Sequence, residues 1–308
     1  LFRFATISDL HLGRDTHRVH STGAPTDRVV DGRRDAASGE LDPHQVVTRV
    51  SDPEDDRAYR CARAALDEAV AWGAERIVVK GDICEETFDE TWDLAAALLR
   101  DVPVPVMTVP GNHDTGTLRQ FEPEDGAAAR GLEVIRGVGH RDVPGLRIVA
   151  VDSTIPDSGW GDVARHADEV AALASEAAGG VVVATHHQPQ RFAVPLYWPH
   201  GIPGPNARRF ARTVRAANTS VLATSGHTHR NRRRRVAGLQ WSEVAATNHF
   251  PGVWAGYTVH EGGLHQTVRR IAEPDTLAWS EQSRRMLGGV WALWAAGDLG
   301  DRCFTLDW

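Results

Sequence analysis

Lysine is almost absent from this sequence of 308 residues: of the 34 residues that are lysine or arginine, only Lys80 is a lysine. Cysteine is also scarce, and Cys61, Cys84 and Cys303 are odd in number and share no short spacing. This argues against a disulfide framework and against a thiolate metal site. No apolar run reaches the roughly 18 residues that a membrane span needs. The net charge of -7 argues against a general binder of nucleic acids or membrane surfaces, because such proteins usually carry a basic balance.

The length and composition suit one large globular domain, because 308 residues, 42% of them hydrophobic, can bury a sizeable core without disulfides or structural metals. No signal peptide is recognisable before the first strand-like run, which begins at Leu1, although one could have been removed ahead of this numbering. We therefore expect a cytoplasmic protein. The sequence leaves the oligomeric state open, and a homo-oligomer is compatible with it.

Short apolar runs rich in valine and isoleucine recur along the chain, and each of them ends in a cluster of polar residues. Such runs are typical of buried strands. Segments with apolar residues at helical spacing lie between them. This alternation predicts an α/β fold in which ligands bind at the carboxyl ends of the strands. The strand-like runs are 1–7, 76–79, 104–109, 181–185 and 220–224, and the helical segments are 56–72, 86–99, 162–178 and 206–217.

Three stretches look like additions to this alternation. Residues 14–57 are polar with little periodicity, which predicts a long loop or partly ordered insert. Residues 188–205 contain five prolines and several aromatic side chains, which predicts a stiff loop. Residues 273–308 contain four of the ten tryptophans and follow the expected last core strand. We therefore predict a domain over 1–272 and a tryptophan-rich C-terminal extension over 273–308.

The polar clusters at the strand ends combine aspartate, asparagine and histidine. Carboxylate and amide oxygens together with imidazole nitrogens suit divalent or trivalent ions such as Mn, Fe, Zn or Co. Two such ions held roughly 4 Å apart need a bridging carboxylate, and they can hold a hydroxide between them. That arrangement stabilises both the attacking and the leaving oxygen of an in-line displacement at phosphorus.

These clusters resemble the five ordered motifs of the calcineurin-like metallophosphoesterases. Their order, spacing and strand-end placement agree with that family over residues 1 to about 260. The resemblance implies a four-layer αββα sandwich with two mixed β-sheets and a metal site at the C-terminal ends of the strands. The motifs are Asp9-Leu10-His11, Gly81-Asp82, Gly111-Asn112-His113-Asp114, His186 and Gly226-His227-Thr228-His229.

The resemblance also implies two metal ions that share the carboxylate of Asp82. His187 directly follows His186, and neighbouring strand residues face opposite ways, so only one of them can bind metal. The last strand residue before the turn is the usual ligand in the family, which favours His186. The first ion would bind Asp9, His11, Asp82 and His229, and the second Asp82, Asn112, His186 and His227.

The candidate catalytic residues implied by the resemblance are His113 and Asp114. His113 would lie over the site, contact the substrate, and either protonate the leaving-group oxygen or stabilise the phosphoryl charge. Asp114 completes the motif, and we expect it to orient the loop rather than bind metal. The family often has Asp or Asn three residues after the bridging Asp82, whereas this chain has Glu85, which leaves the role of that position open.

Further candidate substrate contacts are Lys80, Tyr197 and Trp198. The retention of Lys80 in a chain that otherwise uses arginine suggests that guanidinium does not fit there, and its ammonium could reach a carboxylate or a phosphate oxygen. An ordinary strand-end lysine is the alternative. Tyr197 and Trp198 belong to the aromatic loop, which we expect to hold a base or another organic group over the metals.

The arginine run 230–235 directly follows the last motif. It could attract an anionic substrate, but the favoured interpretation is a solvated hairpin edge, where charge blocks unwanted strand pairing. The tryptophans of the C-terminal extension are expected to be packing residues rather than a platform for stacked bases.

The predicted reaction is hydrolysis of a phosphate ester by a hydroxide that bridges two metal ions. The chain resembles the bacterial cyclic-nucleotide and small-phosphodiester branch of the family, so a small phosphodiester such as a cyclic nucleotide is the favoured substrate. The alternative enzyme is a phosphomonoesterase acting on a nucleotide or sugar phosphate. A nuclease and a non-catalytic binding scaffold are remoter alternatives, and no membrane partner is expected.

Overall fold

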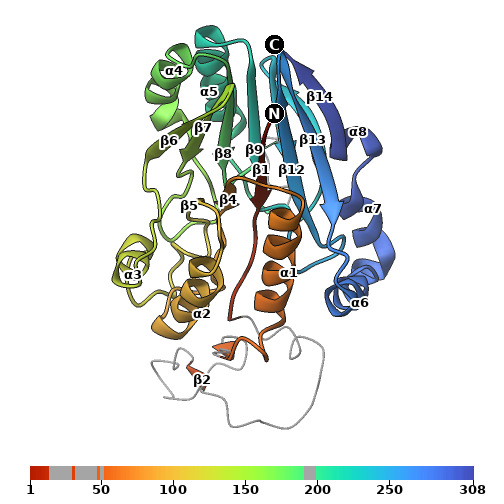
Figure 1. The fold of residues 1–308 in the computed structure, drawn as a ribbon. Coiled ribbons are helices and arrows are strands. Elements are labelled where there is room, and N and C mark those ends of the chain that lie inside the picture. The colour runs from red at the N-terminus through yellow and green to blue at the C-terminus, as the bar shows by residue number, and fades with distance from the viewer. Residues whose placement is uncertain (14–29, 32–46, 49–51, 191–198) are drawn as a thin grey trace.

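The computed structural model describes residues 1–13, 30–31, 47–48, 52–190 and 199–308. Two six-stranded sheets face each other, and helices cover the outer face of each (Figure 1). The first sheet contains, in spatial order, β14 (Cys303–Asp307), β13 (Gly263–Arg270), β12 (Val253–His260), β1 (Phe2–Ile7), β4 (Ile77–Lys80) and β5 (Val106–Val109). The second contains β10 (Arg232–Val236), β11 (Leu239–Glu243), β9 (Val221–Ser225), β8 (Gly180–Thr185), β7 (Leu146–Val151) and β6 (Val138–Val143).

Both sheets are mixed. In the first, β1, β4 and β5 are parallel, and β12, β13 and β14 continue the sheet beyond β1 as antiparallel strands. In the second, β7, β8, β9 and β11 are parallel, and β6 and β10 flank them as antiparallel strands. The carboxyl ends of the two sets of parallel strands meet, because the backbone N–H of His227, beyond β9, donates to the carboxylate of Asp9, beyond β1 (2.9 Å).

Three apolar cores separate the four layers. The first lies between the first sheet and its helices, the second lies between the two sheets, and the third lies between the second sheet and its helices. The predicted four-layer sandwich with two mixed sheets is confirmed. The first sheet is covered by α1 (Arg57–Ala71), α2 (Asp89–Arg100) and α3 (Pro123–Ala129), and the second by α4 (Ala167–Ser175) and α5 (Gly204–Ala217).

The helix predicted over 162–178 is shorter in the structure. The carboxylate of Asp162 accepts from the backbone N–H of Ala164 (2.8 Å), which starts a 3-10 turn over Ala164–His166 before α4 begins. The glycine pair 179–180 then leads into β8. Alanine-rich periodicity in the sequence therefore overestimated the helix at both ends.

The C-terminal residues contribute to the first sheet as well as to its surroundings. They form α6 (Pro274–Ser283), the 3-10 turn η2 (Met286–Gly289), α7 (Val290–Ala296) and α8 (Leu299–Arg302) before β14 pairs with β13. The strand expected to be the last of the core, β13, is thus followed by a further strand of the same sheet, β14. Phe304, Leu306 and Trp308 alternate along β14 and pack into the core between the sheets, which explains why this edge position is occupied.

Most of the predicted insert 14–57 lies outside the described residues, and so do residues 191–198 of the predicted stiff loop 188–205. Within the predicted insert 14–57, the strands β2 (Val30–Asp31) and β3 (Val47–Thr48) pair antiparallel, and Asp56 caps α1 by accepting from Ala58 N (2.9 Å). None of the helices in the described part of the chain combines the length and apolarity needed to cross a bilayer.

We predict that Phe304→Ala destabilises the whole domain. The ring is 7% exposed in the core between the sheets, and truncating a buried phenylalanine costs about 3–5 kcal/mol. The matched control is Leu293→Ala in α7, where the side chain is 86% exposed and the expected change is within about 0.5 kcal/mol. Denaturant unfolding measures both. A separate early transition in Phe304→Ala, with the main transition unmoved, would show that 273–308 folds as an independent appendage.

Candidate metal centre

The segments that follow the strands approach one another so closely that only glycine fits at three motif positions. In proteins a Cβ atom essentially never lies within 3.0 Å of a heavy atom to which it is not bonded, so any side chain at these positions would push the strand ends apart. A Cβ at Gly81, Gly111 or Gly226 would lie 2.7 Å from Nδ1 of His186, 2.1 Å from Oδ1 of Asp82 and 2.5 Å from Oδ2 of Asp9, respectively.

A first group of ligand-type atoms joins the ends of β1, β4 and β9. Nε2 of His229 lies 3.5 Å from Oδ1 of Asp9 and 3.2 Å from Nε2 of His11. Nε2 of His11 in turn lies 3.7 Å from Oδ2 of Asp82. The structure therefore brings together the four residues predicted for the first ion.

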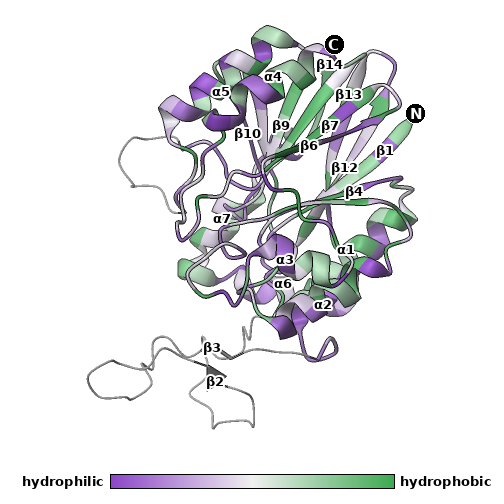
Figure 2. Cartoon of the chain, turned by 90° about the vertical axis from the view of Figure 1, so that its left-hand side faces the viewer, coloured by the Kyte–Doolittle hydropathy of each residue, from purple (hydrophilic) through white to green (hydrophobic). Residues whose placement is uncertain are grey.

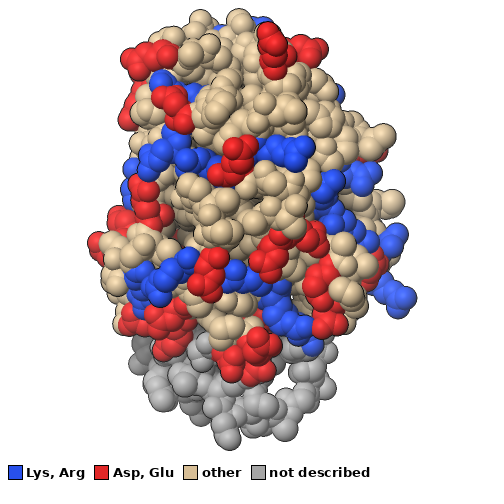
Figure 3. All heavy atoms as spheres, viewed as in Figure 1, with Lys and Arg blue, Asp and Glu red and all other residues tan. Residues whose placement is uncertain are grey.

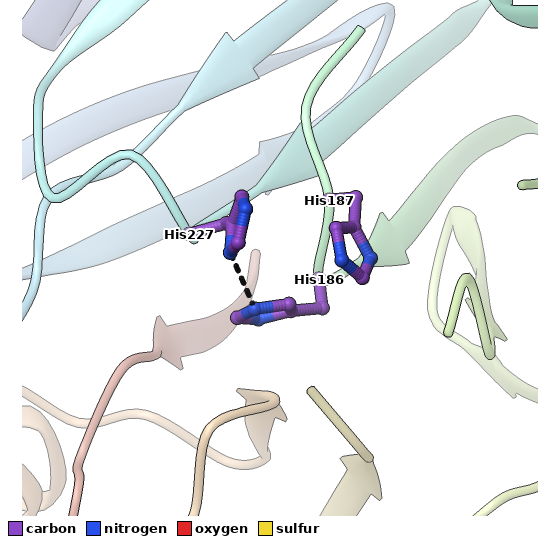
Figure 4. A group of neighbouring side chains, drawn as sticks. All are labelled: His186, His187 and His227. Carbon is purple, nitrogen blue, oxygen red and sulfur yellow. Dashed lines mark hydrogen bonds between the residues drawn. The ribbon is translucent and has the colours of Figure 1, made fainter. Parts of the chain in front are cut away.

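A second group meets at the ends of β4, β5, β8 and β9. Nε2 of His186 lies 3.3 Å from Oδ2 of Asp82, 3.1 Å from Oδ1 of Asn112 and 3.0 Å from Nδ1 of His227 (dashed line in Figure 4). Asp82 contributes to both groups, as a shared carboxylate must. Ligand atoms that bind one ion at about 2.0–2.2 Å lie roughly 3–3.5 Å from one another, so both groups have the spacing of a coordination shell.

The outward hydrogen bonds of the histidines leave lone pairs facing inward. Nδ1–H of His186 donates to the carbonyl oxygen of Lys80 (2.8 Å), and Nε2–H of His227 donates to that of His200 (2.7 Å). Nδ1–H of His11 donates to the carboxylate of Glu85 (2.7 Å). In neutral rings the remaining nitrogens are acceptors that face one another, an arrangement that a cation, either a proton or a metal ion, stabilises. The donor set therefore fits metal ions of the predicted kind.

The electrostatics of the site also favour cations. Burial disfavours charge on Asp9, but the neighbouring His229 holds the pKa of its carboxyl below the usual range. Burial lowers the pKa of His227 to about 3, so its imidazole is neutral and available as a ligand. Although burial opposes it, the Asp82 carboxylate raises the pKa of His186 to about 9. The centre thus favours positive charge, which a bound divalent ion would supply in place of the proton.

Backbone strain concentrates at the same residues. In the described part of the chain, eight residues other than glycine have positive φ, and five of them are predicted metal ligands. Left-handed backbone costs on the order of 1–3 kcal/mol per residue and persists where the surroundings enforce it, which is common at functional sites. The five are Asp9 (56°), His11 (51°), Asp82 (48°), His227 (68°) and His229 (50°).

Two further side chains orient the histidine ligands. Glu85, the position left open by the sequence, fixes the ring of His11, and His249 contacts Nδ1 of His229 through its own Nδ1 (2.8 Å). The sequence analysis missed His249, since a single histidine beyond the motifs has no distinguishing pattern. Its one signal is the polar run Thr247-Asn248-His249 between two apolar strands.

His113 lies at the edge of the centre. Its backbone N–H donates to Oδ1 of Asp82 (3.0 Å), its Nδ1–H donates to the carbonyl oxygen of Glu85 (3.0 Å), and its side chain is 36% exposed. It also lines a cavity of about 320 Å³ beside Asn112. This is the placement expected for a residue that meets the substrate.

Asp114, by contrast, is fully buried and holds the loop together. Its carboxylate accepts from the backbone N–H groups of Ile83 (3.1 Å), Cys84 (3.0 Å) and Gly111 (2.7 Å). Burial, helped by the charge of Asp82, raises its pKa to about 6. These contacts favour the expected orienting role over direct participation in catalysis.

Lys80 does not face the cavity. Its ammonium is fully buried between the sheets, where it donates to the carbonyl oxygen of Ser225 (2.7 Å) and to the hydroxyl of Thr224 (3.2 Å). Burial lowers its pKa to about 7 despite the nearby charge of Asp9. The position does not favour the substrate contact predicted for it. Tyr197 and Trp198 lie outside the described residues.

The two adjacent histidines, His186 and His187, make different contacts in the structure. His187 pairs through Nδ1 with the hydroxyl of Ser153 (2.8 Å), whereas Nε2 of His186 lies close to Asp82 and Asn112. In Figure 4 the ring of His186 is directed toward His227. The side chain of His187 remains close enough to join His186 and His227 in one ligand-type group. Gly161 makes room for it, because a Cβ there would lie 2.4 Å from its ring.

The arginine run is only partly the solvated edge expected of it. β10 is an edge strand of the second sheet, but Arg230 is 3% exposed and Arg234 is 14% exposed. Both pair with the buried carboxylate of Glu243, at 2.9 Å and 3.0 Å. The alternation of the strand turns every second arginine inward, toward a carboxylate that the sequence pattern did not flag.

The tryptophans of the C-terminal extension have packing partners near the centre. The indole N–H of Trp279 donates to the carbonyl oxygen of Asn248 (3.2 Å), and that of Trp291 donates to the carbonyl oxygen of Phe250 (3.1 Å). These two bonds bracket His249 and support the segment that orients His229. The extension therefore buttresses the metal centre.

Comparison with known proteins yields one family. The model of the family described as calcineurin-like phosphoesterase matches residues 2–231. A search of curated proteins finds no match to the chain.

Solved structures with a similar fold share little sequence with this chain. A purple acid phosphatase from yellow lupin (Lupinus luteus) is 11% identical, with a TM-score of 0.56 over 88% of this chain and 52% of its own. A Staphylococcus aureus protein described as a 5'-nucleotidase is 11% identical, with a TM-score of 0.50 over 93% of this chain and 58% of its own. A Thermus thermophilus protein is 9% identical, with a TM-score of 0.50 over 83% of this chain and 93% of its own. These likenesses show the fold, and the chain spans only about half the length of the first two structures.

We predict that Gly111→Ala depletes the centre of metal. The new Cβ would lie 2.1 Å from Oδ1 of Asp82, so the shared carboxylate must move. Gly300→Ala is the control, because a Cβ there has no heavy atom within 4 Å. Metal content by elemental analysis and unfolding by circular dichroism measure the result. Wild-type metal content in a folded Gly111→Ala protein would contradict the role given to Asp82.

We also predict that Glu85→Ala weakens metal binding by about 10–100-fold, the usual effect of removing a carboxylate that orients a ligating histidine. Glu86→Ala, a neighbouring carboxylate with no hydrogen bond to His11, serves as the control. Titration with a competing chelator gives the affinity. Equal affinities for the two variants would mean that the contact between Glu85 and His11 does not support the centre.

Proposed function

The chain belongs to the calcineurin-like phosphoesterases, a family of phosphoric ester hydrolases, and we propose that it hydrolyses a small phosphodiester at a centre of two metal ions. The observation that carries this proposal is the convergence of two groups of ligand-type atoms on the buried carboxylate of Asp82. Two bound ions, drawn from Mn, Fe, Zn and Co, would supply Lewis-acid activation of the phosphoryl group and of the attacking water.

The chain's own residues have separate tasks in this proposal. Asp82 would hold both ions, and the other six ligands would complete the two shells. His113 would meet the substrate at the open edge of the centre. Because its Nδ1–H donates to Glu85, its Nε2 is the ring nitrogen that can meet a leaving-group oxygen. Asp114 would keep the loop that carries Asn112 and His113 in place.

The cavity beside His113 supports a diester over a monoester. Its described lining contains the carboxylates of Glu85, Glu86 and Asp157 and no lysine or arginine. A phosphodiester carries a single negative charge, whereas a monoester approaches two at neutral pH, since its second pKa is about 6. The less charged substrate is repelled less. The finer proposal of a cyclic nucleotide rests on the resemblance of the motifs and on an aromatic loop whose tip lies outside the described residues.

Surface charge gives no support to the nuclease alternative on the face seen in Figure 3. Acidic and basic side chains are interspersed there, without a continuous basic track for a nucleic-acid backbone. The arginines of β10 are the remaining basic feature, and two residues of the run are held by Glu243.

The proposed function is tested by comparing bis(p-nitrophenyl) phosphate with p-nitrophenyl phosphate as substrates of the metal-loaded protein. We expect a higher kcat/KM for the diester. Asp82→Asn should abolish hydrolysis of both and reduce the metal content. A clear preference for the monoester would favour the phosphomonoesterase, and an Asp82→Asn protein with two metals and near wild-type turnover would sink the assignment of the centre.

We predict that His113→Ala keeps most of the metal but loses rate according to the leaving group. A general acid contributes roughly 10²–10⁴-fold when the departing oxygen is basic, and less when the alcohol is acidic. Alkyl and p-nitrophenyl diesters should therefore show different losses in kcat. Elemental analysis provides the control for metal content. Equal losses for both classes of ester would argue against proton donation by His113.

A further inference from the structure

A second polar hollow lies on the other flank of the centre, between α5 and β10. Its volume is about 330 Å³, and the two elements lie side by side in Figure 2. Its described lining contains the arginines 208, 232, 234 and 235 and no acidic residue. This is the reverse of the cavity beside His113, which is lined by acids and no arginine.

One buried carboxylate, that of Glu243, interacts with three arginines that lie in β10 or just before it. Burial opposes ionisation of Glu243, but Arg234, Arg230 and Arg232 lower the pKa of its carboxyl. Glu243 lies opposite Arg232 in the pairing of β11 with β10, and both Arg232 and Arg234 line the hollow.

The first turn of α5 adds to this positive field. It contains no acidic residue, and the positive end of the helix dipole lies there, although Pro205 contributes no N–H. Arg208 reaches back over this turn, since a Cβ on Gly204 would lie 3.1 Å from its Nη1. The side chain of Arg208 is exposed, and within the described residues no carboxylate pairs with it.

The hollow lies close to the metal ligands along two separate segments. Pro189, which lines it, is three residues beyond His186, and Arg232 is three residues beyond His229. Three extended residues span at most about 11 Å. Arg234 also donates to the carbonyl oxygen of Pro189, which ties the two segments together. An anion in the hollow would therefore lie within the length of one small molecule from the centre.

We propose that this arginine-lined hollow, formed by Arg208, Arg232 and Arg234 beside the first turn of α5, binds a phosphate group. Guanidinium groups and helix N-termini both suit phosphate oxygens. The group could be a second phosphate of the substrate, in which case the inference rests on the proposed function and narrows the substrate to a doubly phosphorylated molecule. The bound group could equally be free inorganic phosphate, acting either as a regulator of the reaction or as a product that forms after it.

Calorimetric titration of the metal-loaded protein with inorganic phosphate tests the hollow directly. We expect Arg208→Gln/Arg232→Gln to lose a binding event, or to weaken it at least about tenfold. Arg209→Gln/Arg233→Gln is the matched control, because it removes the same charge from the same helix and strand at positions that do not line the hollow. Asp82→Asn should retain the event, since the hollow does not use the metals. Equal phosphate affinity in the two double variants overturns the proposal.

Kinetics then identify the source of the phosphate. The substrates are a p-nitrophenyl nucleotide diester with and without a second phosphate on its sugar. If the hollow binds the substrate's own phosphate, Arg208→Gln raises KM about tenfold more for the doubly phosphorylated ester, and Arg209→Gln raises neither. If the phosphate event is lost and KM shows no such contrast, free phosphate is the ligand. Should the wild-type protein hydrolyse no ester, the proposed function fails, while the titration still decides whether the hollow binds phosphate.

Discussion

Two buried carboxylates, those of Asp9 and Asp82, impose the main physical demand on this protein. An unpaired buried charge is costly, so the surroundings must supply positive charge and hydrogen bonds. The backbone N–H of His227 and the hydroxyl of Ser8 donate to Asp9, and the backbone N–H of His113 donates to Asp82. The left-handed backbone at five ligands, the three glycines and the inward lone pairs of the histidines all serve this arrangement. Metal ions would complete it.

Much of this could be predicted from the sequence because each motif ends a strand. Parallel strands align their carboxyl ends, so residues far apart in the chain are brought to one edge by the fold itself. The rule that adjacent strand residues face opposite ways was the ground for choosing His186 over His187, but both residues lie beyond the end of β8 and their ring centroids are only 4.9 Å apart. The family pattern supplied the roles, and the structure places the predicted ligand atoms within contact of one another.

The features that could not be predicted depend on contacts that leave no periodic pattern in the sequence. His249 orients His229 from a loop, and only the fold brings them together. Lys80 looked like a residue for the substrate, yet the packing of the two sheets against each other buries its side chain and gives it Thr224 as a partner. Inward arginines on β10 depend on a single buried carboxylate, Glu243. The last strand, β14, was hidden because helices separate it from the rest of the sheet.

The seam between the two sheets runs through the centre, and each ion's ligand shell straddles it. Asp9, His11, Asp82 and Asn112 follow strands of the first sheet, whereas His186, His227 and His229 follow strands of the second. The distance between the two halves is set by the packing between the sheets, where the hydroxyl of Tyr257 on β12 hydrogen-bonds to that of Thr224 on β9 (3.1 Å). The geometry of the centre therefore depends on the separation of the sheets. Side chains deep between the sheets, which touch neither ligand nor substrate, set the distance between the ligands that follow the first sheet and those that follow the second.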